Sequence, residues 1–540
     1  MPCPLNCRTM MTKWEIFHLL LGKTRFLHWS HQKNKISLFI QTGHLYGHVR
    51  NMQHKLMSIE KNSRLASLSR FLWGAVMLTI PVTSFRYFPF LGKSTLVRPL
   101  AFYPLTLLFA VLGFRFLRKE IKLSLPGALI PLAGFLLAAL LATSIGIFYA
   151  PLELRGQEYW ARAIRAWVTV FIGVAFFLGA IWMNREESDL RFSLKWLYLG
   201  LFATILWGGV QLIAFQTPLL AKETMTHWQR AFSMRELVRA NRVSGFAFEP
   251  SWLAGQFSTI YLPWLVAALL SGFRISRHKR IEPILAALTA FLLVMTFSRG
   301  GILISVAAGA LTFILTGRGT LSAIWTWFTS AFQPAGRFWN ISLRIGIVIL
   351  IIVLVVGVVS FLAEREYFNN LIEIPEGGWQ EYVVHNFAGA RVAYAWGALE
   401  AFQSHPWTGV GLGAAGFYIY DNLPDWALTT VPEIARHLSP TTHLYPNAKN
   451  LYVRILAELG ILGFGLFAAF QLSLLGKIQS TLRAQDDFAR FVGVAGLFSW
   501  LAILMVSMTQ DSFAIPNLWI NLGILAGISR TLLAKQKSRE

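Results

Sequence analysis

Residues 441–467 read TTHLYPNAKNLYVRILAELGILGFGLF, a sequence that passes from a polar segment into a helix that becomes wholly apolar. Asn450, Arg454 and Glu458 recur at intervals of four residues, which places them on one face of that helix. A helix that is charged at one end and apolar at the other fits the edge of a lipid bilayer. Charged groups at such an edge need water, a partner or a functional role. The stretch therefore predicts a site at a membrane surface.

The composition is that of a membrane protein. Of 540 residues, 55% are hydrophobic and 14% are charged, whereas soluble domains contain about 25% charged residues. Apolar runs of about 20 residues recur, each long enough to cross a bilayer as a helix. We expect an all-α, polytopic membrane protein that contacts membrane lipids. The net charge of +23 does not indicate a nucleic-acid partner, because basic residues gather in the cytoplasmic loops of membrane proteins.

We predict about twelve membrane-spanning helices. Their expected positions are 67–85, 99–117, 126–149, 165–183, 192–215, 251–272, 281–297, 300–317, 343–363, 451–475, 490–510 and 514–532. Basic residues follow every even-numbered span, which predicts that these connections and both termini are cytoplasmic. The first and third connections also contain basic residues, including Arg155, Arg162 and Arg165, so the contrast is incomplete.

The spans divide the chain into four parts. Residues 1–66 form a basic N-terminal segment, either a cytoplasmic arm or a stretch that precedes a true start at Met57. Residues 67–363 hold spans one to nine and an outward loop at 216–250. Residues 364–450 form a large extracytoplasmic loop in which we expect short helices. Residues 451–540 hold the last three spans and a cytoplasmic tail. Cys3 and Cys7 are the only cysteines, so we expect neither a disulfide nor a zinc site further along.

Basic residues in the outward loops are the candidates for chemistry. Arg242, Arg299, Arg391 and Lys449 each lie near an apolar span or a glycine-rich turn, where an unpaired cation is costly. Others in these loops are explained as well by solvation or lipid headgroups: Arg230, Arg235, Arg239, Arg365 and Arg436. Several converging cations make a site for a polyanion, and the planar guanidinium grips phosphate oxygens with two hydrogen bonds.

The substrate indicated is a lipid-linked pyrophosphate. Cleavage of a sugar from a pyrophosphate leaves negative charge, which arginines stabilise without a metal. The outward loops contain no Asp-x-Asp pair, and the chain has no glycine-rich phosphate loop followed by Lys and Ser/Thr. We predict no metal and no cofactor.

Four motifs resemble bacterial O-antigen ligases and O-antigen polymerases over about residues 67–532. They are RVSGFAFEPSWLA at 242–254, FSRGG at 297–301, Arg391 and Trp396 followed by HPWTGVGLG at 405–413, and NLYVRILAELGILG at 450–463. The resemblance implies a metal-independent glycosyltransferase that uses a glycan on undecaprenyl pyrophosphate as donor. The acceptor would be lipid A–core for a ligase or another lipid-linked glycan for a polymerase. The site would face outward from the inner (cytoplasmic) membrane.

The matching motifs imply that Arg242 and Arg391 bind the pyrophosphate. We add Arg299, Asn450 and Arg454 as substrate-binding candidates. Glu458 is more simply the partner of Arg454 one helical turn away.

One position departs from the family pattern. Ligases usually carry histidine as the general base immediately before Asn450, where this chain has Lys449. A lysine near pKa ~10.4 is a poor base unless burial or neighbouring cations depress its pKa. The candidates for catalysis are therefore His443, Lys449 and Glu249, and the missing histidine favours a polymerase slightly. The glycines of 405–413 are most simply a tight turn against a helix.

Two alternatives remain. A lipid-linked glycan transporter without transferase activity has similar hydropathy, and a structural membrane subunit would need no outward arginines. Transporters usually carry charged residues near mid-span. In this chain the cations gather at one face, which favours chemistry at the membrane surface.

Overall fold

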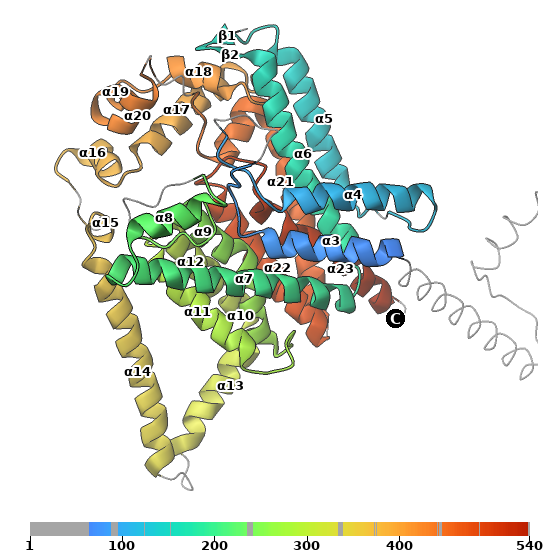
Figure 1. Cartoon of the computed structure of the whole chain (residues 1–540), viewed down its shortest axis with the longest axis vertical. Helices are drawn as coiled ribbons and strands as arrows, with labels where there is room; N and C mark the ends of the chain where they lie inside the picture. Colours follow the sequence, from blue (N-terminus) through green and yellow to red (C-terminus); the bar gives the residue numbers. More distant parts are fainter. Residues whose placement is uncertain are drawn as a thin grey trace, which may run out of the picture. The chain divides into compact units, whose positions relative to one another are not determined.

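The computed structural model describes residues 64–87, 95–123, 125–151, 153–234, 241–332, 338–371, 373, 375–439, 441, 445–484 and 486–537. Residues Ser67–Glu540 form one compact unit, whose helices are labelled in Figure 1. The first elements are α3 (Arg64–Thr79), α4 (Phe102–Leu117), α5 (Leu129–Gly146), β1 (Glu153–Leu154), β2 (Gln157–Glu158), α6 (Tyr159–Met183), α7 (Glu187–Gln216) and α8 (Lys222–Arg230). Next come α9 (Pro250–Gln256), the π-helix η1 (Phe257–Tyr261), α10 (Leu262–Ser271), α11 (Ile281–Met295), α12 (Arg299–Thr316), α13 (Arg318–Thr329), η2 (Ser330–Phe332) and α14 (Phe338–Ala363).

Short helices follow: α15 (Glu366–Asn369), α16 (Gly378–His385), α17 (Gly389–Ser404), α18 (Ala415–Asp421), α19 (Trp426–Thr430) and α20 (Pro432–His437). The chain then forms α21 (Leu451–Arg483), α22 (Asp487–Val506), η3 (Pro516–Leu518) and α23 (Ile520–Lys537). The short helices expected between 364 and 450 are thus present. Their place outside the membrane stays a prediction.

The structure is mostly helical and contains helices able to span a membrane, as predicted. Each of the twelve predicted spans overlaps a helix, and the span 251–272 covers α9, η1 and α10 together. In the part of the chain that the structure describes, eight helices are long and apolar enough to cross a membrane, namely α5, α6, α7, the α9–α10 helix, α12, α14, α21 and α22. The apolar helices α4 and α11 are shorter, so the count of twelve stays a prediction. Within the described residues, β1 and β2 make the single sheet, a two-stranded hairpin between α5 and α6.

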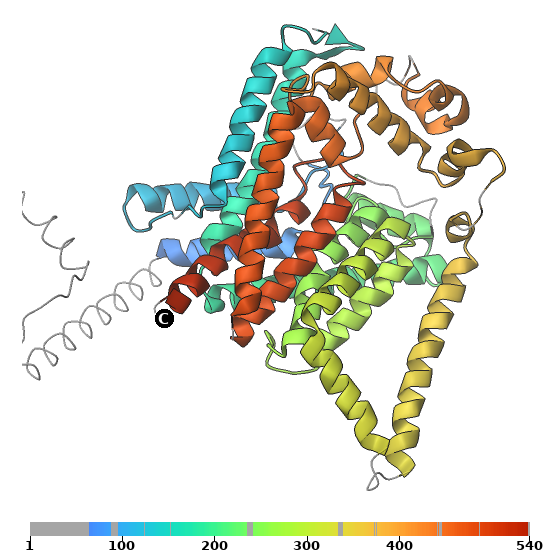
Figure 2. The same ribbon diagram turned by 180° about the vertical axis from the view of Figure 1, so that it is seen from behind.

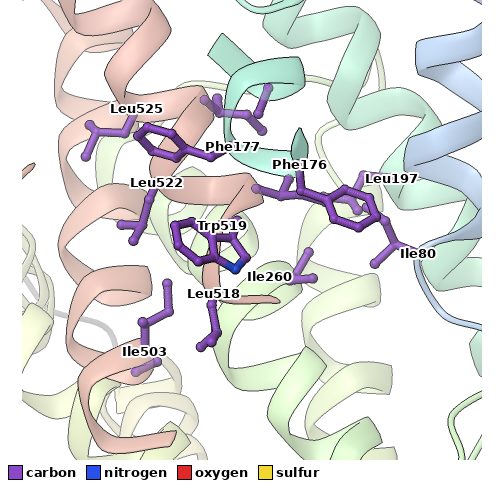
Figure 3. Packing of buried hydrophobic residues seen from close by; sticks show 14 of the residues in the cluster. Ile80, Phe176, Phe177, Leu197, Ile260, Ile503, Leu518, Trp519, Leu522 and Leu525 are labelled. Carbon is purple, nitrogen blue, oxygen red and sulfur yellow. The ribbon is translucent and has the colours of Figure 1, made fainter. Parts of the chain in front are cut away.

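The last three long helices hold the bundle together. Helix α21 packs on α5, α17, α22 and α23, while α23 packs on α6 and α22 packs on α10 and α12 (Figure 1, Figure 2). Figure 3 shows Trp519 among Phe177, Leu518 and Leu522 in the core beside α23. The indole N–H of Trp519 donates to the carbonyl of Phe513 (2.7 Å), so burial leaves this donor bonded. Helix α21 thus packs between α5 and α22, and α22 in turn packs on α10 and α12.

The π-helix η1 is stabilised by polar side chains of neighbouring helices. A π-turn frees backbone carbonyls, and these need partners inside a membrane protein. The amide of Asn521 donates to the carbonyls of Thr259 (2.9 Å) and Ile260 (3.2 Å). The same amide donates to the Ser499 hydroxyl (2.8 Å). This buried network fixes α9–α10 against α22 and α23.

Helix α21 is interrupted at Gly460, whose φ of 63° and ψ of −167° are not helical. The glycine-rich turn before α18 bonds to the backbone on both sides of the break. The N–H of Gly411 donates to the carbonyl of Glu458 (3.0 Å), and the N–H of Ile461 donates to the carbonyl of Pro406 (2.8 Å). The predicted tight turn against a helix is confirmed, and it fixes the charged first turns of α21 relative to the short helices.

Candidate active site

Two adjoining cavities border the residues predicted from the motifs. The first, which we call the arginine cavity, has a volume of about 520 Å³ and is lined by Arg242, Arg299 and Arg391. The second, the mixed-charge cavity, has a volume of about 700 Å³ and is also lined by Arg391. Glu249 and Trp252 line both cavities as well. The structure thus brings together Arg242 from the segment before α9, Arg299 at the first residue of α12 and Arg391 in the first turn of α17.

Two of the three guanidinium groups in the arginine cavity donate hydrogen bonds to backbone or side-chain oxygen atoms of the protein. The Nε of Arg242 donates to the carbonyl of Thr296 (2.8 Å). Arg299 grips Asn386, donating from Nη1 to the side-chain oxygen (2.8 Å) and from Nη2 to the carbonyl (2.5 Å). Arg391, in the first turn of α17, is exposed. These contacts fix the first two arginines and leave the third accessible from both cavities.

Three helix starts meet the arginine cavity. Its lining includes the first residues of α12 and of the α9–α10 helix, and Ala388 and Arg391 at the start of α17. Ser298 caps α12 by accepting from the N–H of Gly301 (3.3 Å). Helix N-termini present partial positive charge and free N–H groups to an anion. Among the described residues, Glu249 is the one carboxylate in this lining, and the Ser251 hydroxyl donates to it.

The arginine cavity also has an apolar wall. Leu303 and Ile304 of α12, Val506 at the end of α22, and Ile515 line it. A cavity with arginines and helix N-termini on one part and aliphatic side chains on another suits an amphiphilic anion.

The mixed-charge cavity balances its charges more evenly. Its cations are Arg162, Arg165, Arg391, Lys449 and Arg454, and its carboxylates are Glu249, Glu433, Glu458 and Asp511. Tyr394, Tyr445 and Trp252 add aromatic surface. Hydroxyl-rich ligands use both donors and acceptors as well as aromatic faces, so this lining is chemically suited to a carbohydrate.

Asp511 organises the entrance to α21. Its carboxylate accepts from the backbone N–H of Lys449 (3.0 Å), a residue with the left-handed φ of 56°. Arg454 donates from Nη1 to the carbonyl of Asp511 (2.7 Å) and from Nε to the carboxylate of Glu458 (3.0 Å). The expected Arg454–Glu458 pair is confirmed, and both residues line the mixed-charge cavity.

Among the described residues, Asn450 is a predicted site residue that lines neither cavity. The side-chain oxygen of Asn450 caps α21 by accepting from the N–H groups of Tyr452 (3.0 Å) and Val453 (3.2 Å). Asn450 lines neither cavity, so the structure gives it a helix-capping contact, and its binding role stays a prediction. His443 lies outside the described residues.

Sequence reasoning missed several lining residues. Arg162 and Arg165 lie on the first turns of α6, where the Arg162 guanidinium covers the Tyr445 ring at 3.9 Å. Arg165 donates to the side chain of Gln157 (3.0 Å). From the sequence alone, both residues are exceptions to the charge pattern of the loops. That excess of basic residues on a predicted outward connection was the available signal.

Two titratable groups that line the mixed-charge cavity, His437 and Tyr394, have shifted pKa values. Burial lowers the pKa of His437, the cations Lys449 and Arg436 lower it further, and Glu433 opposes them. Burial, with a smaller contribution from the Glu433 carboxylate, raises the pKa of Tyr394 to about 12. At neutral pH both the imidazole and the phenol are therefore neutral.

The apolar helices indicate an integral membrane protein, and three of its arginines line one cavity. Residues 284–468 match the family model described as O-antigen ligase. The chain thus carries an O-antigen ligase family domain, and the resemblance predicted from the motifs is confirmed; the family comprises membrane glycan ligases and polymerases of the glycosyltransferase kind. The match contains Arg299, Arg391, Lys449 and Arg454, whereas Arg242 precedes it. None of the curated proteins matches this chain.

Proposed function

We propose that this protein transfers a glycan from an undecaprenyl-pyrophosphate donor to a hydroxyl group of an acceptor sugar at the outer face of the inner membrane. The observation that carries the proposal is the convergence of Arg242, Arg299 and Arg391, from three separate segments, on one cavity. The family match gives the reaction class, membrane glycan ligation or polymerisation.

The donor diphosphate occupies the arginine cavity in this proposal. Three guanidinium groups and three helix N-termini line it, against one carboxylate among the described lining residues, that of Glu249. The arginines and helix N-termini are preorganised. They stabilise the charge that develops on the diphosphate as the glycosidic bond breaks, because the protein does not have to reorganise during the reaction. The aliphatic wall formed by Leu303, Ile304 and Val506 takes the first part of the polyprenyl chain.

The acceptor sugar occupies the mixed-charge cavity. Arg391, Glu249 and Trp252 line both cavities, so the anomeric carbon of the donor lies near them. Glu249 and Lys449 remain candidates for acting on the acceptor, and Arg454 binds it or holds the local charges in place. A polymerase would accept a second lipid-linked glycan, and a ligase would accept lipid A–core.

Charge changes test the diphosphate site. We expect Arg391→Glu and Arg242→Glu to abolish transfer by the full-length protein in proteoliposomes supplied with donor extracted from native membranes. Arg391→Lys keeps the positive charge but cannot form bidentate hydrogen bonds with a phosphate, so we expect partial activity. Arg230→Glu is the matched control, because Arg230 is exposed in the outward loop and lines neither cavity. Normal transfer by both cavity variants would reject the proposal.

A deletion strain distinguishes the two reaction types. Loss of all polymer on lipid A, with lipid-linked polymer accumulating, indicates a ligase. Single repeat units that remain on lipid A indicate a polymerase.

A further inference from the structure

The sequence candidates that line the proposed acceptor cavity are Glu249, which also lines the arginine cavity, and Lys449, which stands where the resemblance implies a general-base histidine. Among the described residues, His437 is the histidine that lines either cavity, and it lines the mixed-charge cavity together with Lys449. Its side chain is 25% exposed, which leaves it reachable from the cavity while most of the ring is covered. His437 ends α20, whose other titratable residue on this cavity is Glu433.

The imidazole of His437 has a carboxylate partner. Its Nδ1 lies 3.8 Å from the Glu433 Oε1, one helical turn earlier on α20. A carboxylate beside one ring nitrogen orients the ring and stabilises the imidazolium that forms when the other nitrogen takes a proton. Catalytic hydrogen bonds are often long without substrate and shorten in the reacting complex.

The charges around His437 keep it ready to accept a proton. Lys449, on the segment before α21, and Arg436, on α20, both oppose its protonation, and Glu433 favours it. Arg155, from the hairpin, reaches the end of α20 and donates to the carbonyl of Ser439 (2.6 Å). Burial acts in the same direction as the cations, so the neutral imidazole is the resting form at pH 7.

We propose that His437 is the general base for the acceptor hydroxyl and that Glu433 is its positioning residue, an inference that rests on the proposed function. The ring nitrogen remote from Glu433 removes the hydroxyl proton. The acceptor oxygen forms a bond to the anomeric carbon, and the bond from that carbon to the phosphate oxygen breaks. Its electron pair stays on the diphosphate, which Arg242, Arg299 and Arg391 stabilise. The proton then passes from His437 to water.

The test compares transfer with donor binding in the full-length protein in proteoliposomes. We expect His437→Gln to lower the transfer rate by roughly a hundredfold to ten-thousandfold, the range for loss of a general base. Binding of undecaprenyl pyrophosphate should not change. Added imidazole should restore part of the activity of His437→Ala. The matched control is His385→Gln, because His385 also lies 3.8 Å from a glutamate, Glu373, but neither residue lines a cavity.

The pH profile separates this role from a structural one. Wild-type transfer should fall as the pH drops through a value below the ordinary histidine pKa of about 6.5, because the protonated ring accepts no proton. His437→Gln should lose this limb. Glu433→Gln should move the limb to lower pH, since Glu433 favours the protonated ring.

Two results would overturn the inference. One is a His437→Gln protein with wild-type rate or an unchanged pH profile, and the other is a variant that loses transfer and undecaprenyl-pyrophosphate binding together. Failure of the proposed function looks different, since the wild-type protein itself would then neither bind undecaprenyl pyrophosphate nor transfer glycan.

Discussion

Three bulky residues adopt left-handed backbone conformations immediately before helices that meet the cavities. Phe297 (φ 45°) precedes the Ser298 cap of α12, Phe387 (φ 53°) precedes α17, and Lys449 (φ 56°) precedes the Asn450 cap of α21. Such conformations are costly for side chains other than glycine and persist only where the surroundings impose them. Each one aims the first turn of a helix, with Arg299, Arg391 or Arg454, at a cavity.

Asp511 provides the clearest test of this arrangement at a single residue. Asp511→Ala removes the acceptor for the N–H of Lys449, and we expect a loss of about 1–3 kcal/mol in the free energy of unfolding. We also expect at least a tenfold loss of transfer, because the backbone at Lys449 loses the contact that holds it at the mixed-charge cavity. Asp511→Asn keeps an acceptor oxygen and should be milder in thermal unfolding and in transfer assays. Equal effects of the two substitutions would argue against a positioning role.

At the scale of elements, the break in α21 connects the site to the membrane helices. Gly460 has a φ of 63°, and a Cβ there would lie 2.3 Å from the carbonyl oxygen of Trp407. The glycine-rich turn and the broken helix therefore form one unit, in which each supplies the other's missing backbone hydrogen bonds. This unit holds the turns of α21 that carry Arg454 and Glu458 against the glycine-rich turn.

We expect Gly460→Ala to destabilise the protein by about 1–3 kcal/mol or more, through both backbone strain and the clash. Gly465→Ala is the matched control in the same helix, because a Cβ at Gly465 meets no atom within 4 Å. That substitution should be neutral or stabilise by about 0.5–1 kcal/mol. Thermal unfolding in detergent measures both, and equal melting temperatures would contradict a specific requirement at Gly460.

Helices were predictable from the sequence where apolar runs are long, and all twelve predicted spans overlap helices. Local exceptions were not predictable. The π-turn η1 depends on Asn521, which is distant in sequence. Helix α13 has no buried residue, so it has no buried face that a periodic pattern could reveal. For the site, motifs indicated Arg242, Arg299 and Arg391, which line one cavity.

The remaining site residues depend on contacts that no local pattern encodes. Asp511 comes from the connection after α22 and reaches the segment before α21. His437 ends a helix of six residues, α20. Their contribution depends on which segments meet in space, and neither segment's own sequence shows which other segment it meets.

For the whole molecule, the order of the helices predicts which side the cavities face. By the loop-charge pattern, even-numbered spans run from outside to inside. Four of them, α6, the α9–α10 helix, α12 and α21, begin with residues that line a cavity. All four starts therefore lie on one side of the membrane if the predicted topology holds, and that side is extracytoplasmic.

Cysteine labelling tests this orientation, because Cys3 and Cys7 are the only native cysteines and can both be replaced by serine. Asp421→Cys then places a thiol at the exposed end of α18, and Lys279→Cys places one in the exposed turn between α10 and α11. We expect a membrane-impermeant maleimide to label the first in intact spheroplasts and the second only after permeabilisation. The reverse labelling pattern would place both cavities on the cytoplasmic side of the membrane, where a donor at the outer face could not reach them. Because the starts of four helices share the cavities, these two positions decide the side for the whole site.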